Sequence, residues 1–241
     1  MNQLYIVTGA SRGIGAHLVS EILREPDAVV LGISRKASGE ARVQSVLADL
    51  ATPEGRRVAM QAVEAKLLER PWAKAVLLNN AGMVEPVASV ERLDPEELER
   101  NIGLNVTAVL ALMHAFLVGS KAIPVRRVIN ISSGAAKRAY YGWAAYCGAK
   151  SAVDAASAIA ALEAEQDGSG VVVTSLAPGM VDTDMQALLR GVDEALFPHS
   201  TQFRKVKADG GLKRPEDVAE KILRLERAGR MPAGVAALGE L

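Results

Sequence analysis

Hydrophobic positions along this chain gather into short apolar runs that alternate with longer stretches of helical spacing. Continuous apolar runs predict strands at residues 4–7, 28–33, 75–78, 127–131 and 171–176, a weaker strand at 45–48 and a short final one at 235–238. Because these runs lack the alternation of a half-exposed strand, we expect a sheet covered on both faces.

Helical spacing of apolar residues predicts helices over residues 13–24, 53–68, 95–118, 143–165 and 215–227. Two of the starts carry strong N-terminal patterns, because Thr52 precedes Pro53 and Asp94 precedes Pro95. A hydroxyl or carboxylate at such a position accepts backbone N–H bonds, and proline fits the first position of a helix.

Strands that alternate with helices indicate right-handed crossovers and a mostly parallel sheet. The predicted fold is α/β, a Rossmann-type doubly wound sheet flanked by helices on both faces, and residues 1–241 are expected to form a single domain. Residues 182–211 are longer than a simple connection. Two interpretations stay open for them: a substrate lid, or a peripheral pair of helices that packs its own apolar face.

Composition excludes several classes of protein. The formal net charge is zero, with 28 basic and 28 acidic residues, so neither nucleic acid nor a membrane is expected as a partner. Cys147 is the single cysteine, which rules out an internal disulfide and, without a secretory pattern, favours a cytoplasmic location. No metal is expected, since the histidines lack metal-ligand spacing: His17, His114 and His199.

A glycine-rich loop follows the first predicted strand and opens a helix. Gly9, Gly13 and Gly15 let the backbone turn tightly and approach a phosphate, which the helix N-terminus attracts. This context predicts a dinucleotide site. At the end of the second strand, Ser34 and Arg35 stand where an acid would favour NAD. Since Arg12 also lies in the glycine loop and arginine binds phosphate well, NADPH is favoured over NADH.

Tyr146 and Lys150 lie one helical turn apart and share a helix face. Lowering a phenol pKa by about three units takes roughly 4 kcal/mol. A positive charge at about 4 Å supplies a similar amount at an effective dielectric of 20. Ser133 follows a strand, at the edge of the sheet where ligands bind in such folds. These groups predict proton transfer to a carbonyl oxygen.

The motifs together resemble the short-chain dehydrogenase/reductase family, and they span nearly the whole chain in that family's order. They are Thr-Gly-x-x-x-Gly-x-Gly at 8–15, Asn-Asn-Ala-Gly at 79–82, a helix asparagine at Asn105, Ser133 before Tyr146, and Pro178-Gly179 followed by Thr183. The resemblance implies that Tyr146 is the general acid and that Ser133 orients the carbonyl. Lys150 would lower the Tyr146 pKa and hold the nicotinamide ribose, and Asn105 would anchor a water in a proton relay.

With the glycine loop and the end of the second strand, the resemblance gives a full set of expected cofactor contacts. They are Gly9, Ser11, Arg12, Gly13, Ile14, Gly15, Ser34, Arg35, Asp49, Leu50, Asn80, Ala81, Gly82, Tyr146, Lys150, Pro178, Gly179, Val181 and Thr183.

Within the family, residues 142–147, 177–186 and 207–211 are similar to the branch that contains sepiapterin reductase and enzymes that reduce benzil-like 1,2-diketones. Sepiapterin reductase holds its pterin with an aspartate near the C-terminus, where our alignment places Leu238, with Glu240 nearby. Leucine cannot replace those hydrogen bonds, so a 1,2-dicarbonyl or aryl ketone is favoured over a pterin. The expected pocket residues are Ser133, Trp143, Met180 and Met185.

The predicted function is NADPH-dependent reduction of a ketone or 1,2-dicarbonyl. Two alternatives stay open: a reductase of another ketone class (3-oxoacyl or steroid), and a non-catalytic NADPH-binding sensor, which the complete reactive set disfavours. The alanine-rich stretch from Ala144 to Ala164 has small residues on several helix faces, which permits close packing across a two-fold axis; the alternative is that these alanines face the sheet. By resemblance we expect a homodimer, with a homotetramer as the alternative.

Overall fold

A computed structural model describes residues 2–241, and within them seven parallel strands form one sheet in the order β3-β2-β1-β4-β5-β6-β7. This confirms the predicted doubly wound α/β fold. The strands are β1 (Gln3–Thr8), β2 (Ala28–Ser34), β3 (Val43–Leu47), β4 (Lys74–Asn79), β5 (Val125–Ile131), β6 (Val172–Ala177) and β7 (Gly234–Ala237). The order reverses between β1 and β4, and such switch points place ligands at the carboxyl edge of the sheet.

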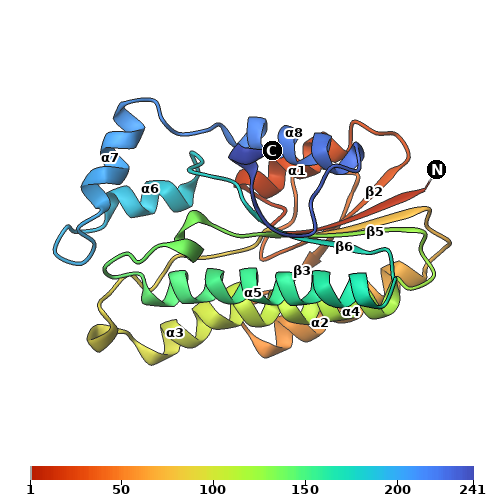
Figure 1. The fold of residues 1–241 in the computed structure, drawn as a ribbon, viewed down its shortest axis with the longest axis horizontal. Helices are drawn as coiled ribbons and strands as arrows, with labels where there is room; N and C mark the ends of the chain where they lie inside the picture. Colours follow the sequence, from red (N-terminus) through yellow and green to blue (C-terminus); the bar gives the residue numbers. More distant parts are fainter. Residues whose placement is uncertain (1) are drawn as a thin grey trace.

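Helices cover both faces of the sheet (Figure 1). On one face, α1 (Gly13–Ile22) packs on α8 (Pro215–Arg227); on the other, α2 (Pro53–Leu68) packs on α4 (Ala108–Gly119), beside α5 (Ala144–Gln166). Each face holds its own apolar cluster, one containing Val7 and Ile222, the other Leu77 and Phe116. Burial of the inner strands on both faces explains why they read as unbroken apolar runs.

The predicted helix over 95–118 is continuous but changes its winding. It comprises α3 (Pro95–Ile102), a π-helical turn (η2, Gly103–Thr107) and α4, and Asp94 caps it by accepting from the Glu96 and Glu97 amides at 2.9 and 3.0 Å. By length and hydropathy alone, Pro95–Gly119 could cross a membrane. It packs instead on α2 and β4 and buries residues such as Leu112 and Phe116, as the core helix of a folded domain does.

Residues 182–211, which resisted assignment from sequence, contain two short helices beyond the carboxyl edge (Figure 1). They are α6 (Asp184–Gly191) and α7 (Ser200–Ala208), which pack on each other. Leu189, Phe197 and Phe203 from this segment join a cluster with Trp143 and Tyr146. The helical pair therefore packs against the start of α5 as well as on itself.

Strand boundaries differ from the sequence prediction by up to two residues, including those of the two edge strands, β3 and β7. β3 begins at Val43, earlier than the predicted 45–48, because this edge strand exposes Gln44, Ser45 and Leu47 and so lacks a clear apolar run. β7 ends at Ala237, and Leu238 starts a short 3₁₀ turn (η4, Leu238–Glu240). Two further 3₁₀ turns are η1 (Val90–Arg92) and η3 (Gly134–Lys137).

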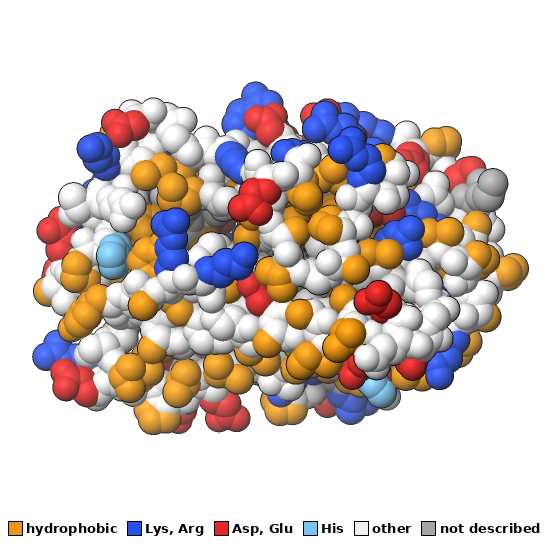
Figure 2. Space-filling view, in the orientation of Figure 1, with side chains coloured by type: hydrophobic (Ala, Val, Ile, Leu, Met, Phe, Trp, Pro, Cys, Tyr) orange, Lys and Arg blue, Asp and Glu red, His pale blue; other side chains and the backbone are white. Residues whose placement is uncertain are grey.

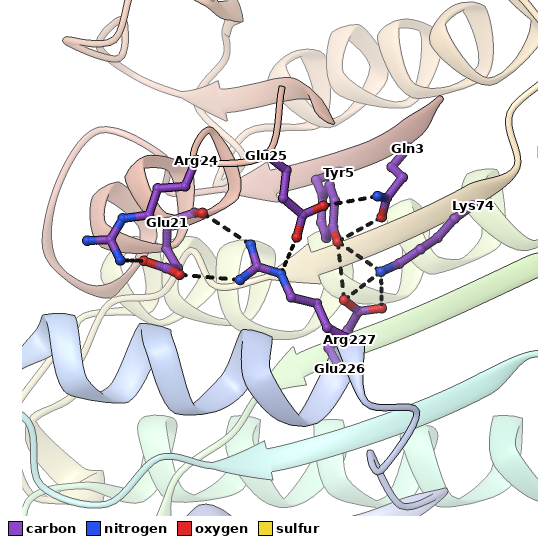
Figure 3. Close-up of polar contacts among 8 residues, drawn as sticks. All are labelled: Gln3, Tyr5, Glu21, Arg24, Glu25, Lys74, Glu226 and Arg227. Atoms are coloured by element: carbon purple, nitrogen blue, oxygen red, sulfur yellow. Dashed lines mark hydrogen bonds and ion pairs between the residues drawn. The ribbon is translucent and has the colours of Figure 1, made fainter. Parts of the chain in front are cut away.

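A buried charged cluster fastens the amino edge of the sheet (Figure 3). Lys74 Nζ lies 2.8 Å from the Glu226 carboxylate, whose side chain is 1% exposed, and donates to Tyr5 Oη at 2.9 Å. Tyr5 in turn donates to Glu226 at 3.2 Å. Burial, followed by the nearby acids Glu226 and Glu25, raises the pKa of Tyr5 well above its usual value. The cluster ties β1, β4 and α8 together, far from the edge where ligands are expected.

Candidate functional site

The glycine loop and the loop after β4 are tied together at the carboxyl edge. Thr8 Oγ1 accepts from the Asn80 and Ala81 amides, both at 2.9 Å, and Asn80 Nδ2 donates to the Thr8 carbonyl at 3.0 Å. A Cβ added at Gly15 would lie 2.1 Å from the Gly9 carbonyl oxygen, so no other residue fits without moving the backbone. This bare, tightly turned backbone before α1 is the cradle that a pyrophosphate requires. The predicted loop residues Ser11 and Arg12 lie in this turn, and Gly13 and Ile14 begin α1.

The ends of β2 and β3 lie side by side and carry the polar residues expected near the adenine end. Ser34 pairs in register with Leu47, just before Asp49 and the buried Leu50. Burial acts to raise the pKa of Asp49. Hydrogen bonds from Arg100 and the Ala51 amide, together with the positive charges of Arg100 and Arg35, outweigh burial and lower this pKa. The acid is thus engaged by arginine, and the exposed Arg35 lies close enough for its charge to act on Asp49.

Gly82 brings Asn105 and Lys150 together. A Cβ built at Gly82 would lie 3.1 Å from Asn105 Oδ1 and 3.7 Å from Lys150 Nζ, so both polar groups face the space that glycine leaves open. Asn105 is fully buried in the π-helical turn, and its amide donates to the Met83 carbonyl at 2.8 Å and accepts from the Met83 N–H at 3.1 Å. Single π-turns of this kind are frequent at functional sites.

Tyr146 and Lys150 are both buried on α5, beside Ser133 at the end of β5. Burial raises the pKa of Tyr146 to about 12, a hydrogen bond with Ser133 lowers it, and Cys147 raises it. Burial lowers the pKa of Lys150 to about 8, and the charge of Asp154 acts in the opposite direction. A protonated phenol and a partly desolvated ammonium therefore lie together in one closed environment.

The expected lowering of the Tyr146 pKa by Lys150 is not found in this structure. Lys150 Nζ lies 5.8 Å from the centre of the Tyr146 ring, and its charge is not among the causes that shift the pKa of the phenol. It points to the carbonyl oxygen of Ile131, to which it donates at 2.8 Å. Burial of the phenol thus decides the direction of its shift.

The segment after β6 faces the glycine loop. Thr183 caps α6, and its Cγ2 would lie 3.6 Å from a Cβ at Gly13. Pro178 and Gly179 lie against Lys213, whose Nζ donates to the Pro178 carbonyl at 3.1 Å. Val181 is buried in the core cluster beneath. The predicted contacts from this segment therefore converge on the same edge as those from β1, β4 and β5.

Aromatic rings surround Tyr146 on the side of the helical pair. Trp143 lies 4.9 Å from Tyr146 and 5.0 Å from Phe197 between ring centroids, and its Nε1 has no hydrogen-bond partner within residues 2–241. Met185 from α6 reaches within 4.0 Å of a Cβ at Gly82. Met180 is 41% exposed, whereas Leu238 is buried in the core cluster with Val181. Among the predicted pocket residues, Ser133, Trp143 and Met185 lie close to the reactive groups.

Comparison with protein families identifies the family of this chain. The family model of the short chain dehydrogenases matches residues 3–192.

The chain belongs to the short-chain dehydrogenase family. It is therefore an oxidoreductase of a family that binds a nicotinamide cofactor. It is 31% identical to a benzil reductase ((S)-benzoin forming) of Bacillus subtilis over 94% of each chain. It is also 31% identical to the sepiapterin reductase of Meriones unguiculatus over 95% of this chain and 93% of the relative.

Solved structures of this family share the fold. The KRED1-Pglu enzyme superposes with a TM-score of 0.83 at 28% identity, covering 98% of this chain and 100% of that one. A putative NAD(P)-dependent gluconate 5-dehydrogenase from Beutenbergia cavernae, solved with bound NADP, gives a TM-score of 0.80 at 28% identity over 98% of this chain and 94% of that one.

Several residues at this edge of the short-chain dehydrogenase were not singled out from sequence. Asp154 accepts hydrogen bonds from Ser132 and Ser175, Arg100 binds Asp49, and Lys213 braces the loop after β6. Asp154 follows Lys150 by one helical turn, so an i,i+4 search on the predicted helix would have found it. Ser175 and Lys213 come from distant parts of the chain, and only the folded topology brings them here.

Proposed function

We propose that this protein is an NADPH-dependent carbonyl reductase that acts on ketones or 1,2-dicarbonyl compounds. One observation carries the proposal: Asn105, Ser133, Tyr146 and Lys150 come from three different elements and lie together beside the glycine cradle. The similarity to benzil and sepiapterin reductases, over nearly the whole chain, supports the same class of reaction.

The residues of the carboxyl edge fit a dinucleotide. The loop over residues 9–15 would hold the pyrophosphate, residues 49–50 and 80–82 the adenosine side, and Lys150 with Pro178, Gly179, Val181 and Thr183 the nicotinamide side. When bound, the reduced nicotinamide supplies hydride to the carbonyl carbon. Gly15 lets the Gly9 backbone fold tightly against α1, and Gly82 leaves the space in front of Asn105 and Lys150 free of a side chain.

Tyr146 supplies the proton. Its buried phenol, with a pKa raised to about 12, carries a proton throughout the neutral range and can release it to a carbonyl oxygen that is gaining negative charge. Ser133 donates a hydrogen bond to the same oxygen and orients it. Once the phenol has lost its proton, the Lys150 ammonium offsets the new negative charge. A water held by Asn105 would then pass a proton to Lys150 as Lys150 gives its own proton to the Tyr146 phenolate.

We favour NADPH because no acid follows β2. Ser34 and Arg35 stand there instead, and Arg12 lies in the glycine loop. Arg12 donates to Asp184 at 3.1 Å, but both side chains are mostly exposed, so this pair is weak and leaves the guanidinium able to bind a 2′-phosphate.

The aromatic surroundings of Tyr146 favour an aryl or other weakly polar carbonyl compound. Trp143 and Met185 would contact its apolar part, with Met180 at the rim and the pair α6–α7 as a lid. A reductase of a 3-oxoacyl or steroid ketone is the second candidate, and a panel of diketones, pterins and acyl thioesters separates the two. A sensor without turnover is disfavoured by the complete reactive set.

The oligomer that fits best is a homodimer formed through α4 and α5. The outer face of α5 carries small residues together with the exposed Ile159 and Leu162, and α4 adds Leu110 and Val118. Hydrophobic side chains gather over this lower layer in Figure 2. A face of small and apolar residues is self-complementary across a two-fold axis.

Replacing Tyr146 with phenylalanine tests the proposed function. Without the phenolic proton, kcat/KM for benzil with NADPH should fall by about a hundredfold to ten-thousandfold, the usual contribution of a general acid. NADPH affinity, measured by fluorescence titration, should stay nearly unchanged. Tyr141→Phe is the matched control, because Tyr141 is exposed and lies in the same segment. Wild-type turnover by Tyr146→Phe would contradict the proposal.

A further inference from the structure

A carboxylate one turn beyond Lys150 joins the catalytic helix to two strands. Asp154 Oδ1 accepts from Ser132 Oγ at 2.5 Å and from Ser175 Oγ at 2.6 Å. Ser132 and Ser175 are buried, and Ser132 is the residue directly before Ser133. One oxygen atom thus holds the end of β5 and an interior position of β6 against α5.

Asp154 is the middle member of a series of contacts along α5. Lys150 donates to the Ile131 carbonyl at 2.8 Å, and Ser157 accepts from Asn130 Nδ2 at 2.9 Å. Neighbouring turns of one helix therefore hold the three residues that lead into Ser133. The placement of the Ser133 hydroxyl against Tyr146 depends on this alignment.

We propose that Asp154 is a positioning residue for the reduction: its carboxylate fixes Ser132, and so the adjoining Ser133, while placing a negative charge beside the Lys150 ammonium. The inference rests on the proposed function. Asp154 touches neither the reacting carbonyl nor the cofactor space, and it acts through Ser133 and Lys150.

The charge environment of Lys150 gives this role a measurable direction. The ionisable groups that face Lys150 are Tyr146 and Asp154, both on its own helix. The other packed elements present neutral groups: the Ile131 carbonyl at the end of β5 and the Asn105 amide beside Gly82. From β6, the Ser175 hydroxyl faces Asp154. Burial lowers the pKa of Lys150, and among the described residues Asp154 is the charge that raises it. Removing that charge must therefore lower the pKa of Lys150 further, so that the ammonium is lost at a lower pH.

Two variants separate the charge from the hydrogen bonds. Asp154→Asn keeps an amide oxygen that can accept from both hydroxyls but removes the charge. Ser175→Ala removes one hydrogen bond and keeps the charge. Glu163→Gln, on an exposed turn of the same helix, is the control for a charge change on α5. The pKa of Lys150 is read by NMR of ¹³C-labelled lysine, with the signal assigned by Lys150→Arg, alongside the pH profile of kcat/KM for benzil.

We expect the Lys150 pKa to fall by about one unit in Asp154→Asn, the order of effect of a nearby charge at an effective dielectric of 20. The alkaline limb of kcat/KM should move down with it, while Ser175→Ala and Glu163→Gln leave both unmoved. If the wild type is active and Asp154→Asn changes neither the Lys150 pKa nor the pH profile of kcat/KM, the inference about Asp154 is overturned and the proposed function stands. A wild type inactive on every carbonyl compound overturns the proposed function, and the NMR titration then still decides whether Asp154 sets the charge on Lys150.

Discussion

At the scale of single residues, the end of β2 offers the sharpest test of cofactor choice. Ser34→Asp with Arg35→Ala should reverse the preference for NADPH, because a carboxylate repels a 2′-phosphate and accepts hydrogen bonds from a free ribose 2′-hydroxyl. The ratio of kcat/KM values for NADPH and NADH should fall at least about tenfold, as expected for the loss of one charged hydrogen bond.

Lys36→Ala is the matched control for that prediction, since it removes the neighbouring cation and leaves Ser34 and Arg35 in place. It should change the ratio little. An equal drop in the control would mean that general positive charge, rather than the two residues at the strand end, selects the cofactor.

Single residues also show where sequence reasoning reached its limit. The one-turn spacing of Tyr146 and Lys150 was visible, and the structure does place both beside Ser133 and Asn105. What spacing could not supply was the rotamer of Lys150. Its ammonium binds the Ile131 carbonyl, and this contact comes from the packing of α5 on β5.

At the scale of elements, the cluster in Figure 3 should stabilise the joint between β4 and α8. Lys74→Met leaves the Glu226 carboxylate buried without its cation, and breaking such a pair costs about 3 kcal/mol or more. The free energy of unfolding, measured by urea denaturation, should fall accordingly.

The double variant Lys74→Met with Glu226→Leu removes both charges and should recover most of that loss. The exposed pair of Glu54 and Arg57 serves as a comparison, since breaking it should change stability little. A Lys74→Met variant as stable as the wild type would show that the buried pair contributes nothing.

Elements were predicted well where burial imposes a pattern and poorly where it does not. The N-terminal caps at Thr52 and Asp94 both form as expected, each accepting backbone N–H bonds. The helices α6 and α7 are short, and their apolar residues face Trp143 and Tyr146 across the site. Each helix is too short to show a clear apolar periodicity, and the residues it packs on are distant in sequence. Both interpretations of residues 182–211 therefore had to stay open. Its role as a lid stays a prediction.

At the scale of the whole molecule, the proposed two-fold contact can be tested directly. Ile159→Glu with Leu162→Glu would place charges in the centre of the α5 face and should convert a dimer into a monomer of 25.4 kDa. Light scattering after gel filtration gives the mass. Leu68→Glu is the control, because Leu68 is more exposed and lies outside this face. A wild type that is monomeric at all concentrations would contradict the dimer.

The parallel direction of the strands followed from alternation alone, because strands joined by helices return in the same direction. The order of the strands did not, since the reversal between β1 and β4 depends on which strands pair. The family resemblance supplied the expected residues of the carboxyl edge, whereas the strand order and the places of Asp154, Ser175 and Lys213 needed coordinates.

The carboxyl and amino ends of the parallel strands form two opposite rims of the sheet, and the two rims have separate roles. The proposed chemistry occupies one rim, and the salt-bridged anchor of Tyr5, Lys74 and Glu226 occupies the other. Because the two rims lie at opposite ends of the strands, an engineer can change the aromatic residues around Trp143 while the anchor at the other rim continues to stabilise the fold. Variant libraries that diversify the residues around Trp143 and stabilise the opposite rim should therefore tolerate more substitutions than libraries confined to one rim.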